Sequence, residues 1–143
     1  MKKYFFFLFF SCVNTIALTL PHAIAFPRST ASNPVKKIVR EIAKSNIYKF
    51  TPSADNSDTR SVWDRRYEEL RKSASVEELT QLATKHKNAV VRLYAFRALV
   101  TRLKNIPGAI IDQIRNDSTV VSTLQNNKAG QSPVNKIALS FLY

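Results

Sequence analysis

The sequence predicts an all-α fold, in the form of a short right-handed array of antiparallel helix pairs (an α-solenoid). Apolar residues recur at helical spacing in most segments after residue 33, and short polar turns separate these segments. The whole chain contains only two glycines, Gly108 and Gly130. So few glycines are atypical of a turn-rich β fold, and no segment fits strand alternation better than helical spacing.

Residues 1–25 have the features of a secretory signal peptide. A basic start at Lys2-Lys3 is followed by an apolar run over 4–20 and by the small-residue triplet Ala23-Ile24-Ala25. We therefore expect cleavage near Ala25 and a periplasmic or secreted protein. Two alternatives stay open. The apolar run is about as long as the shortest membrane anchors, and Cys12 follows residues that faintly resemble a lipoprotein box.

After cleavage, residues 26–33 would form a disordered polar lead and residues 34–143 a single helical domain. That mature chain would lack cysteine, so its core alone must stabilise it. The full chain has 22 Lys plus Arg, 10 Asp plus Glu and a net charge of +12. This charge favours anionic partners such as nucleic acid, anionic lipid, lipopolysaccharide or an acidic protein face, although basic residues can also simply solvate helix surfaces.

The first two helices are predicted on either side of a loop. Asn33-Pro34 is a favourable start for a helix over 34–44, because proline is harmless at the first helical position. The turn-forming residues of 51–58 predict the loop, and a second helix follows over 59–72. The expected apolar faces are Val35, Ile38, Val39 and Ile42 in the first helix, and Val62, Trp63, Tyr67 and Leu70 in the second.

The next two helices form a pair joined by a very short turn. Ser75 and Glu78 have the spacing of a capping box for the third helix, which is expected to end near Lys85. Asn88 is the expected cap of the fourth helix, over 89–103. That helix is apolar around most of its circumference, which is typical of a central helix.

The last part of the chain is predicted to hold three further helices. Pro107 starts the fifth, and Asp117 or Ser118 caps the sixth, with Val120, Val121 and Leu124 facing inward. Residues 126–131 are expected to form a polar turn, and Ser132-Pro133 starts the last helix. The alternation of Ile137, Leu139 and Phe141 also suits a short strand, so the structure of residues 132–143 stays open.

An internal repeat supports the solenoid prediction. Residues 87–92 and 117–122 carry similar patterns about 30 residues apart, a period typical of stacked helix pairs. The sequence of 91–99, V-R-L-Y-A-F-R-A-L, resembles the second helix of HEAT or HEAT-like repeats, and the turn at 86–89 resembles the turn before it. Residues 78–102 are similar to small exported HEAT-like proteins of uncharacterised function from Bacteroidetes-type bacteria.

The small residues of the fourth helix allow close approach of a partner helix. The expected repeat-packing residues are Val91, Arg92, Ala95, Ala98 and Leu99. The resemblance implies that Arg92 braces a turn. However, Lys87-Asn88 stands where the acidic partner is usual, so we hypothesise that Arg92 is available for another partner.

The sequence offers little catalytic chemistry. His86 is the lone histidine of the mature chain, and no phosphate-binding, serine-nucleophile or zinc-protease motif occurs, so we expect no metal, no cofactor and no enzyme. Some HEAT-like folds are nevertheless enzymes, such as alkylpurine DNA glycosylases and phycobilisome lyases. A glycosylase-like basic face with aromatic residues could be imitated by Trp63, Tyr67, Tyr94, Arg65, Arg66 and Arg97.

Three functional hypotheses follow. The first is an exported scaffold that binds another protein. The second is a basic module for an anionic polymer or membrane surface, and the third, more remote, is an enzyme. The candidate anion-binding residues of the second are Lys36, Lys37, Arg40, Arg65, Arg66, Arg71, Lys72, Arg97, Arg102 and Lys104.

Overall fold

A computed structural model describes residues 33–50 and 62–143. The predicted signal peptide, residues 26–32 of the predicted lead, the loop 51–58 and residues 59–61 of the second helix lie outside these ranges. The described elements follow in the order α1 (Asn33–Ser45), β1 (Ile47–Lys49), α2 (Val62–Ser73), α3 (Val76–Lys85), α4 (Ala89–Arg102), α5 (Gly108–Arg115), β2 (Val120–Gln125), β3 (Lys128–Pro133) and α6 (Val134–Leu139).

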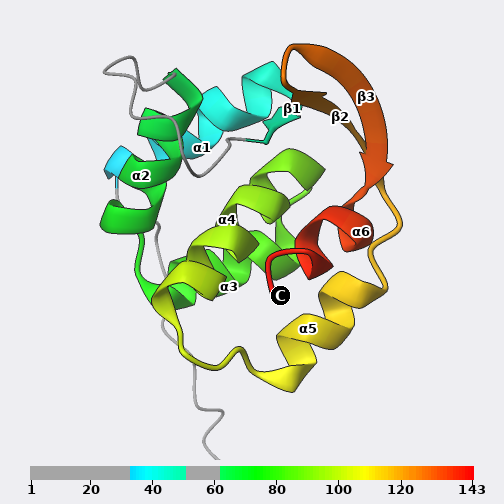
Figure 1. The fold of residues 1–143 in the computed structure, drawn as a ribbon. Helices are drawn as coiled ribbons and strands as arrows, with labels where there is room; N and C mark the ends of the chain where they lie inside the picture. Colours follow the sequence, from blue (N-terminus) through cyan, green and yellow to red (C-terminus); the bar gives the residue numbers. More distant parts are fainter. Residues whose placement is uncertain (1–32, 51–61) are drawn as a thin grey trace, which may run out of the picture.

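The described chain is mostly helical, and α4 lies at its centre (Figure 1). Helices α1 and α2 lie on one side of α4, and α5 and α6 lie on the other. Helix α4 contacts the helices α1, α2, α3 and α6 and the strands β1 and β2. Its apolar residues are buried around most of the circumference, as the sequence predicts for a central helix.

The cores of the other helices largely follow the predicted apolar faces. Val35, Ile38 and Ile42 are buried in α1, and Tyr67 and Leu70 are buried in α2. The prediction is wrong for Val62, which begins α2 and is exposed.

The expectation of an all-α fold is wrong for the segment between α5 and α6. Residues 120–133 form a β-hairpin, and β1 adds a third strand in the order β1-β2-β3. β1 pairs with β2 in parallel, with Tyr48 opposite Thr123, and β2 pairs with β3 antiparallel, with Thr123 opposite Gly130. The predicted sixth helix and most of the predicted polar turn at 126–131 are therefore strands.

The hairpin has a physical basis in its sequence. Val120, Val121 and Thr123 are β-branched, and alternate residues of β2 face the core, with Val121 and Thr123 buried and Ser122 exposed. Asn126 and Asn127 have positive φ angles of 49° and 61°, as a two-residue type I′ turn requires. The strong local turn and the period of two override the helical spacing of Val120, Val121 and Leu124.

The end of the chain returns to helix. Residues 134–139 form α6, with Val134, Ile137 and Ala138 buried against the core, so the alternative of a terminal strand is wrong. Ser132 belongs to β3 and does not cap α6, which begins directly after Pro133. None of the helices within residues 33–50 and 62–143 has the length and apolar character needed to span a lipid bilayer.

Candidate functional site

The turn between α3 and α4 is the best-defined polar centre of the molecule. The predicted capping box of α3 is confirmed: the Glu78 amide donates to Ser75 Oγ at 3.1 Å, and the Ser75 amide donates to Glu78 Oε2 at 2.8 Å. Asn88 caps α4 as predicted, because its Oδ1 accepts from the Val91 amide at 3.0 Å. These caps fix where α3 begins and where the turn gives way to α4.

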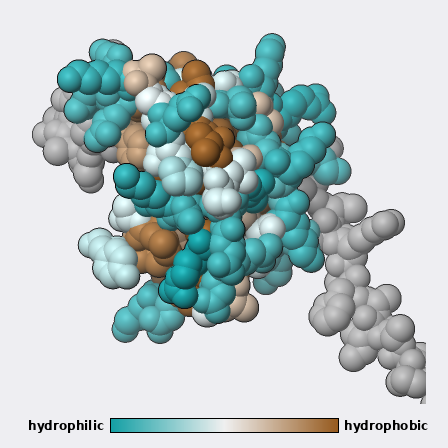
Figure 2. Space-filling model, turned by 90° about the vertical axis from the view of Figure 1, so that its right-hand side faces the viewer, coloured by the Kyte–Doolittle hydropathy of each residue, from teal (hydrophilic) through white to brown (hydrophobic). Residues whose placement is uncertain are grey.

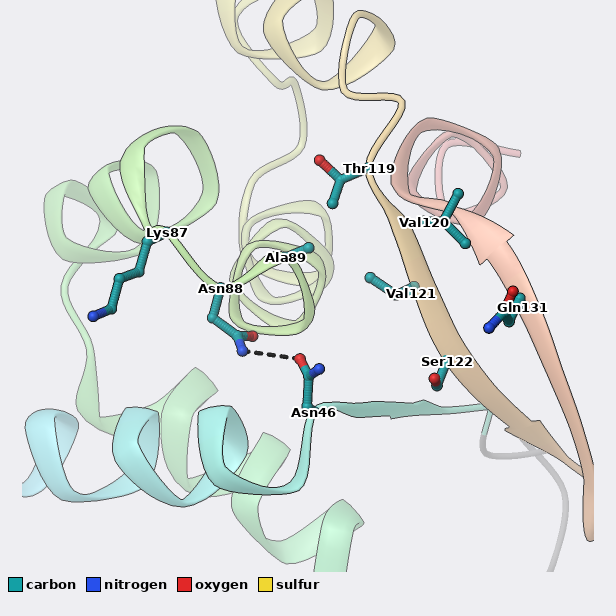
Figure 3. A pocket seen from close by; sticks show the side chains of 9 residues that line it. All are labelled: Asn46, Lys87, Asn88, Ala89, Thr119, Val120, Val121, Ser122 and Gln131. Carbon is teal, nitrogen blue, oxygen red and sulfur yellow. Dashed lines mark hydrogen bonds between the residues drawn. The ribbon is translucent and has the colours of Figure 1, made fainter.

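Asn88 also joins the turn to a distant part of the chain. Its side-chain Nδ2 donates to Asn46 Oδ1 at 3.0 Å, and Asn46 lies between α1 and β1 (Figure 3). Asn46 has a positive φ of 51°, a conformation in which asparagine is favoured over most residues. The cap of α4 therefore positions the start of the parallel strand β1.

Arg92 connects this turn to the chain that leads into the sheet. Its Nε donates to Asp117 Oδ2 at 2.7 Å, and its Nη2 donates to Thr119 Oγ1 at 3.0 Å. Its Nη1 donates to the carbonyl oxygens of His86 and Lys87, at 2.9 and 3.3 Å. The side chains of Arg92 and Asp117 are each only 14% exposed, so this ion pair is shielded from solvent.

The hypothesis that Arg92 is available for another partner is therefore wrong. The acid that is missing from the turn is supplied by Asp117, which lies between α5 and β2. Asp117 does not cap a helix, and instead accepts from the Thr119 amide at 3.2 Å. Burial alone would raise the pKa of Asp117, but the hydrogen bonds from Arg92 and Thr119 outweigh it and hold that pKa below its usual value.

The other predicted repeat-packing residues lie inside the core. Val91, Ala95, Ala98 and Leu99 have no solvent-exposed surface, whereas Arg92 lies in the first turn of the same helix with its side chain 14% exposed. Ala95 and Ala98 leave room along α4 for its several neighbours. They serve packing, and none of the four is available to a ligand.

Two hollows lie beside the turn. The first, of about 270 Å³, separates the start of α4 from β2, where Asn88 and Ala89 face Val120 and Val121 (Figure 3). The second, of about 400 Å³, lies between the end of α3 and α5 and is lined by residues that include His86 and Gln113. Thr84, His86 and Asp117 all line the second hollow, but each is engaged within the protein. Asp117 Oδ2 accepts from Arg92, Thr84 Oγ1 donates to the Thr80 carbonyl, and His86 Nδ1 accepts from the Asn88 amide.

His86 is a structural residue of the turn. Its Nδ1 accepts from the Asn88 amide at 3.1 Å, a bond that requires this nitrogen to be unprotonated. Burial lowers the pKa of His86, and the nearby charges of Arg92 and Lys87 add to this effect, against a hydrogen bond with Asn88 that raises it. The neutral imidazole thus completes the turn.

Four of the ten candidate anion-binding residues are engaged within the protein. Arg66 pairs with Glu41 at 3.0 Å, and Arg71 pairs with Glu68 at 2.6 Å. The Arg97 guanidinium lies over the Tyr67 ring at 4.4 Å, and Arg102 donates to the Ala74 carbonyl. The remaining six are exposed, namely Lys36, Lys37, Arg40, Arg65, Lys72 and Lys104.

The structure brings together most of the aromatic and basic residues that could imitate a glycosylase face. Trp63 lies between two cations, with Arg66 at 4.9 Å and Lys49 at 5.4 Å from its ring. Tyr67 and Tyr94 pack with their ring centroids 6.3 Å apart. Arg65 is exposed on the same helix as Trp63.

The hydroxyl groups of these tyrosines serve the fold. The Tyr94 hydroxyl accepts from the Lys49 amide at 3.3 Å, and the Tyr67 hydroxyl bonds to Thr101 Oγ1 at 2.9 Å. Tyr48, which the sequence did not single out, packs against Tyr94 at 5.0 Å, and burial strongly raises its pKa. The cluster therefore holds β1 against α4 and α2.

Metal chemistry has no candidate centre here: within residues 33–50 and 62–143, no group of three or more histidine, cysteine, aspartate or glutamate side chains is placed to hold an ion.

The sheet carries two of the exposed large hydrophobic residues of the described ranges, Ile47 and Val120. Its inner face is covered by α4, whereas its outer face leaves Ile47 36% and Val120 60% exposed. Figure 2 shows the side of the molecule beyond β3, where small hydrophobic patches interrupt a hydrophilic surface. Sequence reasoning missed this surface, because the strands themselves were not predicted.

No protein-family model, curated protein or solved structure matches the chain.

Proposed function

We propose that this chain is an exported, non-catalytic protein-binding module, built on a short HEAT-like array whose last repeat ends in a β-hairpin. The α3–α4 pair would be the central repeat, with α1 and α2 before it. α5 would begin the next repeat, and β2 and β3 would replace its second helix. End repeats of solenoids commonly differ from internal ones, because they close the core.

The ion pair between Arg92 and Asp117 supports this organisation. It joins the last position of the first sequence copy, 87–92, to the first position of the second copy, 117–122. A bridge of this kind links the turn of one repeat to the next. The extensive packing of α3 against α4 also supports a helix pair as the basic unit.

The observation that carries the binding role is the uncovered outer face of the sheet. Exposed apolar residues that adjoin each other on a regular surface are typical of interaction sites. Ile47 and Val120 are exposed apolar residues on one face of the sheet: Ile47 pairs with Ser122, two residues along β2 from Val120. Both lie on the face opposite buried Tyr48 and Val121. A protein surface that packs against them would bury apolar area and exclude water from the sheet.

A second candidate function, binding of an anionic polymer or lipid surface, is favoured by the six exposed cations. Lys36, Lys37 and Arg40 lie on α1, and Arg65 and Lys72 lie on α2, two helices that pack together. Such binding would depend mainly on charge, and it would weaken steeply as salt releases counterions from the polymer.

Affinity capture with matched variants separates these two functions. The full chain is immobilised and exposed to an exported-protein extract, to heparin and to lipopolysaccharide, and each is eluted with increasing salt. We expect a specific protein to remain bound at high salt and to be lost from Val120→Lys, while Lys37→Glu retains it. Two results together would refute the protein-binding proposal. The chain would bind heparin and lose it in Lys37→Glu and Arg40→Glu, and no captured protein would remain bound at high salt.

A further inference from the structure

The outer edge of β3 is an open strand edge. β3 is the last strand in the order β1-β2-β3, so within the described residues it has a strand neighbour on one side only. Lys128, Ala129, Gly130 and Gln131 are all exposed. An exposed edge offers unpaired backbone groups, to which an extended peptide can add as a further strand.

The hairpin register shows which backbone groups point outward. A two-residue turn at Asn126-Asn127 closes on a hydrogen-bonded pair, Gln125 with Lys128, and bonded and non-bonded pairs alternate beyond it. Ala129 and Gln131 therefore occupy non-bonded positions. Their N–H and C=O groups point away from β2, towards the open edge.

Two contacts agree with this register. Leu124, opposite Ala129, accepts from the Phe50 amide at 3.0 Å, so its carbonyl faces away from β3. At the end of the hairpin away from the turn, Val120 and Pro133 form a non-bonded pair, so the next pair, Thr119 and Val134, should be hydrogen-bonded. The Val134 amide does donate to the Thr119 carbonyl, at 2.9 Å. Pro133 occupies a non-bonded position, where an N–H would point outward, so the absence of this group in proline removes no hydrogen bond to β2.

The charge around this edge selects an acidic occupant. Residues 118–143, which include β2, β3 and α6, contain Lys128 and Lys136 and no aspartate or glutamate. Lys128 lies on the edge strand itself, and Lys136 lies on α6, which contacts β3. The net charge of +12 over the chain opposes pairing of two copies along this edge, whereas it attracts an acidic segment.

We propose that β3 binds an extended acidic segment of a partner protein by β-strand addition, through the outward backbone groups of Ala129 and Gln131. This inference rests on the proposed protein-binding function and narrows it to one edge and one class of partner. Backbone pairing would supply the orientation, and carboxylates beside Lys128 would supply the preference for acidic sequences.

The probe is a displayed library of short random peptides, selected on the purified full chain. We expect the selected peptides to be acidic and to alternate apolar with polar residues. The variant Gln131→Pro removes an outward N–H without removing a bond to β2, so it should weaken binding at least tenfold, while Gln131→Ala should not. Lys128→Glu should weaken binding similarly, and Lys37→Glu, on α1, should change it little.

Hydrogen exchange on the same complex tests the register. In the free protein the amides of Ala129 and Gln131 should exchange fast, and those of Gly130 and Ser132 should be protected by β2. A bound peptide should protect Ala129 and Gln131 as well. Protection elsewhere, selection of no peptide or of basic peptides, or equal binding to Gln131→Pro would each overturn the proposal.

Two further outcomes separate this inference from the broader function. If a captured protein partner binds Gln131→Pro unchanged, the edge assignment fails and protein binding itself stands. If the free chain dimerises in solution and Gln131→Pro abolishes the dimer, the edge belongs to a second copy, and the proposal of an acidic partner is wrong.

Discussion

Removal of the Arg92 side chain should be the most damaging change to a polar residue in this protein. Arg92→Ala deletes four hydrogen bonds, to Asp117, Thr119 and the carbonyls of His86 and Lys87. It also leaves the Asp117 carboxylate, which is only 14% exposed, without its cation.

The magnitude follows from the burial of the pair. Loss of one partner from a fully buried ion pair costs about 3–5 kcal/mol, and loss of an exposed pair costs under about 1 kcal/mol. The Arg92–Asp117 pair lies nearer to the buried limit, so we expect Arg92→Ala to lower the free energy of unfolding by about 2–4 kcal/mol. That is a large part of the stability of a typical domain, about 5–15 kcal/mol.

The assay is urea unfolding followed by circular dichroism, with Arg115→Ala as the matched control. Arg115 pairs with Asp112 at a similar distance, 3.0 Å, but their side chains are 61% and 66% exposed. The control should change the free energy of unfolding by less than about 0.5 kcal/mol. If Arg92→Ala unfolds at the same urea concentration as Arg115→Ala, the bridge does not hold the repeat to the hairpin.

Four other predictions concern stability. Because the pKa of Asp117 is lowered in the folded state, its ion pair stabilises the fold fully above the unfolded-state pKa. This stabilisation is lost as pH falls through the lower folded-state pKa. In unfolding measured against pH, Asp117→Asn should remove this part of the loss of stability in acid. The lowered pKa of His86 also makes the fold less stable as pH falls. The contribution of His86 to the free energy of unfolding should be complete above its unfolded-state pKa of about 6.5 and decrease below it. His86→Asn, which keeps an acceptor for the Asn88 amide, should reduce this loss of stability at low pH. Ala95→Leu should overpack the fully buried face of α4 and lower the free energy of unfolding by about 1–3 kcal/mol; a thermal transition equal to wild type would disprove the tight packing. Asn127→Gly should stabilise the hairpin by about 0.5 kcal/mol, because glycine adopts the positive φ of 61° at no steric cost, and an unchanged melting temperature would argue against the type I′ turn.

Local signals predicted the helices well, because the information lies within a few residues. The capping box of Ser75 with Glu78 and the Asn88 cap are each decided by neighbours three residues away, and both are confirmed. The centrality of α4 also followed from its own composition, since a helix that is apolar nearly all round can only be buried.

The sheet could not be predicted in the same way, because its pairing is non-local. β1 is three residues long and has meaning only beside β2, where Ile47 pairs with Ser122. In β2, the residues Val120, Val121 and Leu124 satisfy helical spacing as well as a strand does, so periodicity alone gave the wrong structure. The two asparagines of the hairpin turn were the signal that could have decided it.

The candidate site shows the same difference between features that depend on neighbouring residues and features that depend on tertiary contacts. The resemblance to a repeat singled out Arg92, but its partner Asp117 lies 25 residues further along the chain. Three of the ten basic candidates, Arg66, Arg97 and Arg102, are engaged by groups from elsewhere in the fold, such as Glu41 for Arg66. A list of cations read from sequence cannot separate these from the exposed ones, because the distinction depends on tertiary contacts.

The central claim is that this chain binds a protein through its sheet and not an anionic polymer through its lysines and arginines. The most direct test is the dissociation constant of the captured complex, measured by calorimetry over a range of salt concentrations. In the proposed interface, backbone pairing and exposed apolar residues such as Val120 act beside a few lysines such as Lys128. This interface therefore predicts a dependence of affinity on salt much shallower than that of a polymer bound through many cations. A steep slope of the logarithm of the dissociation constant against the logarithm of the salt concentration would contradict it, if the slope corresponds to the release of several counterions and Val120→Lys leaves it unchanged.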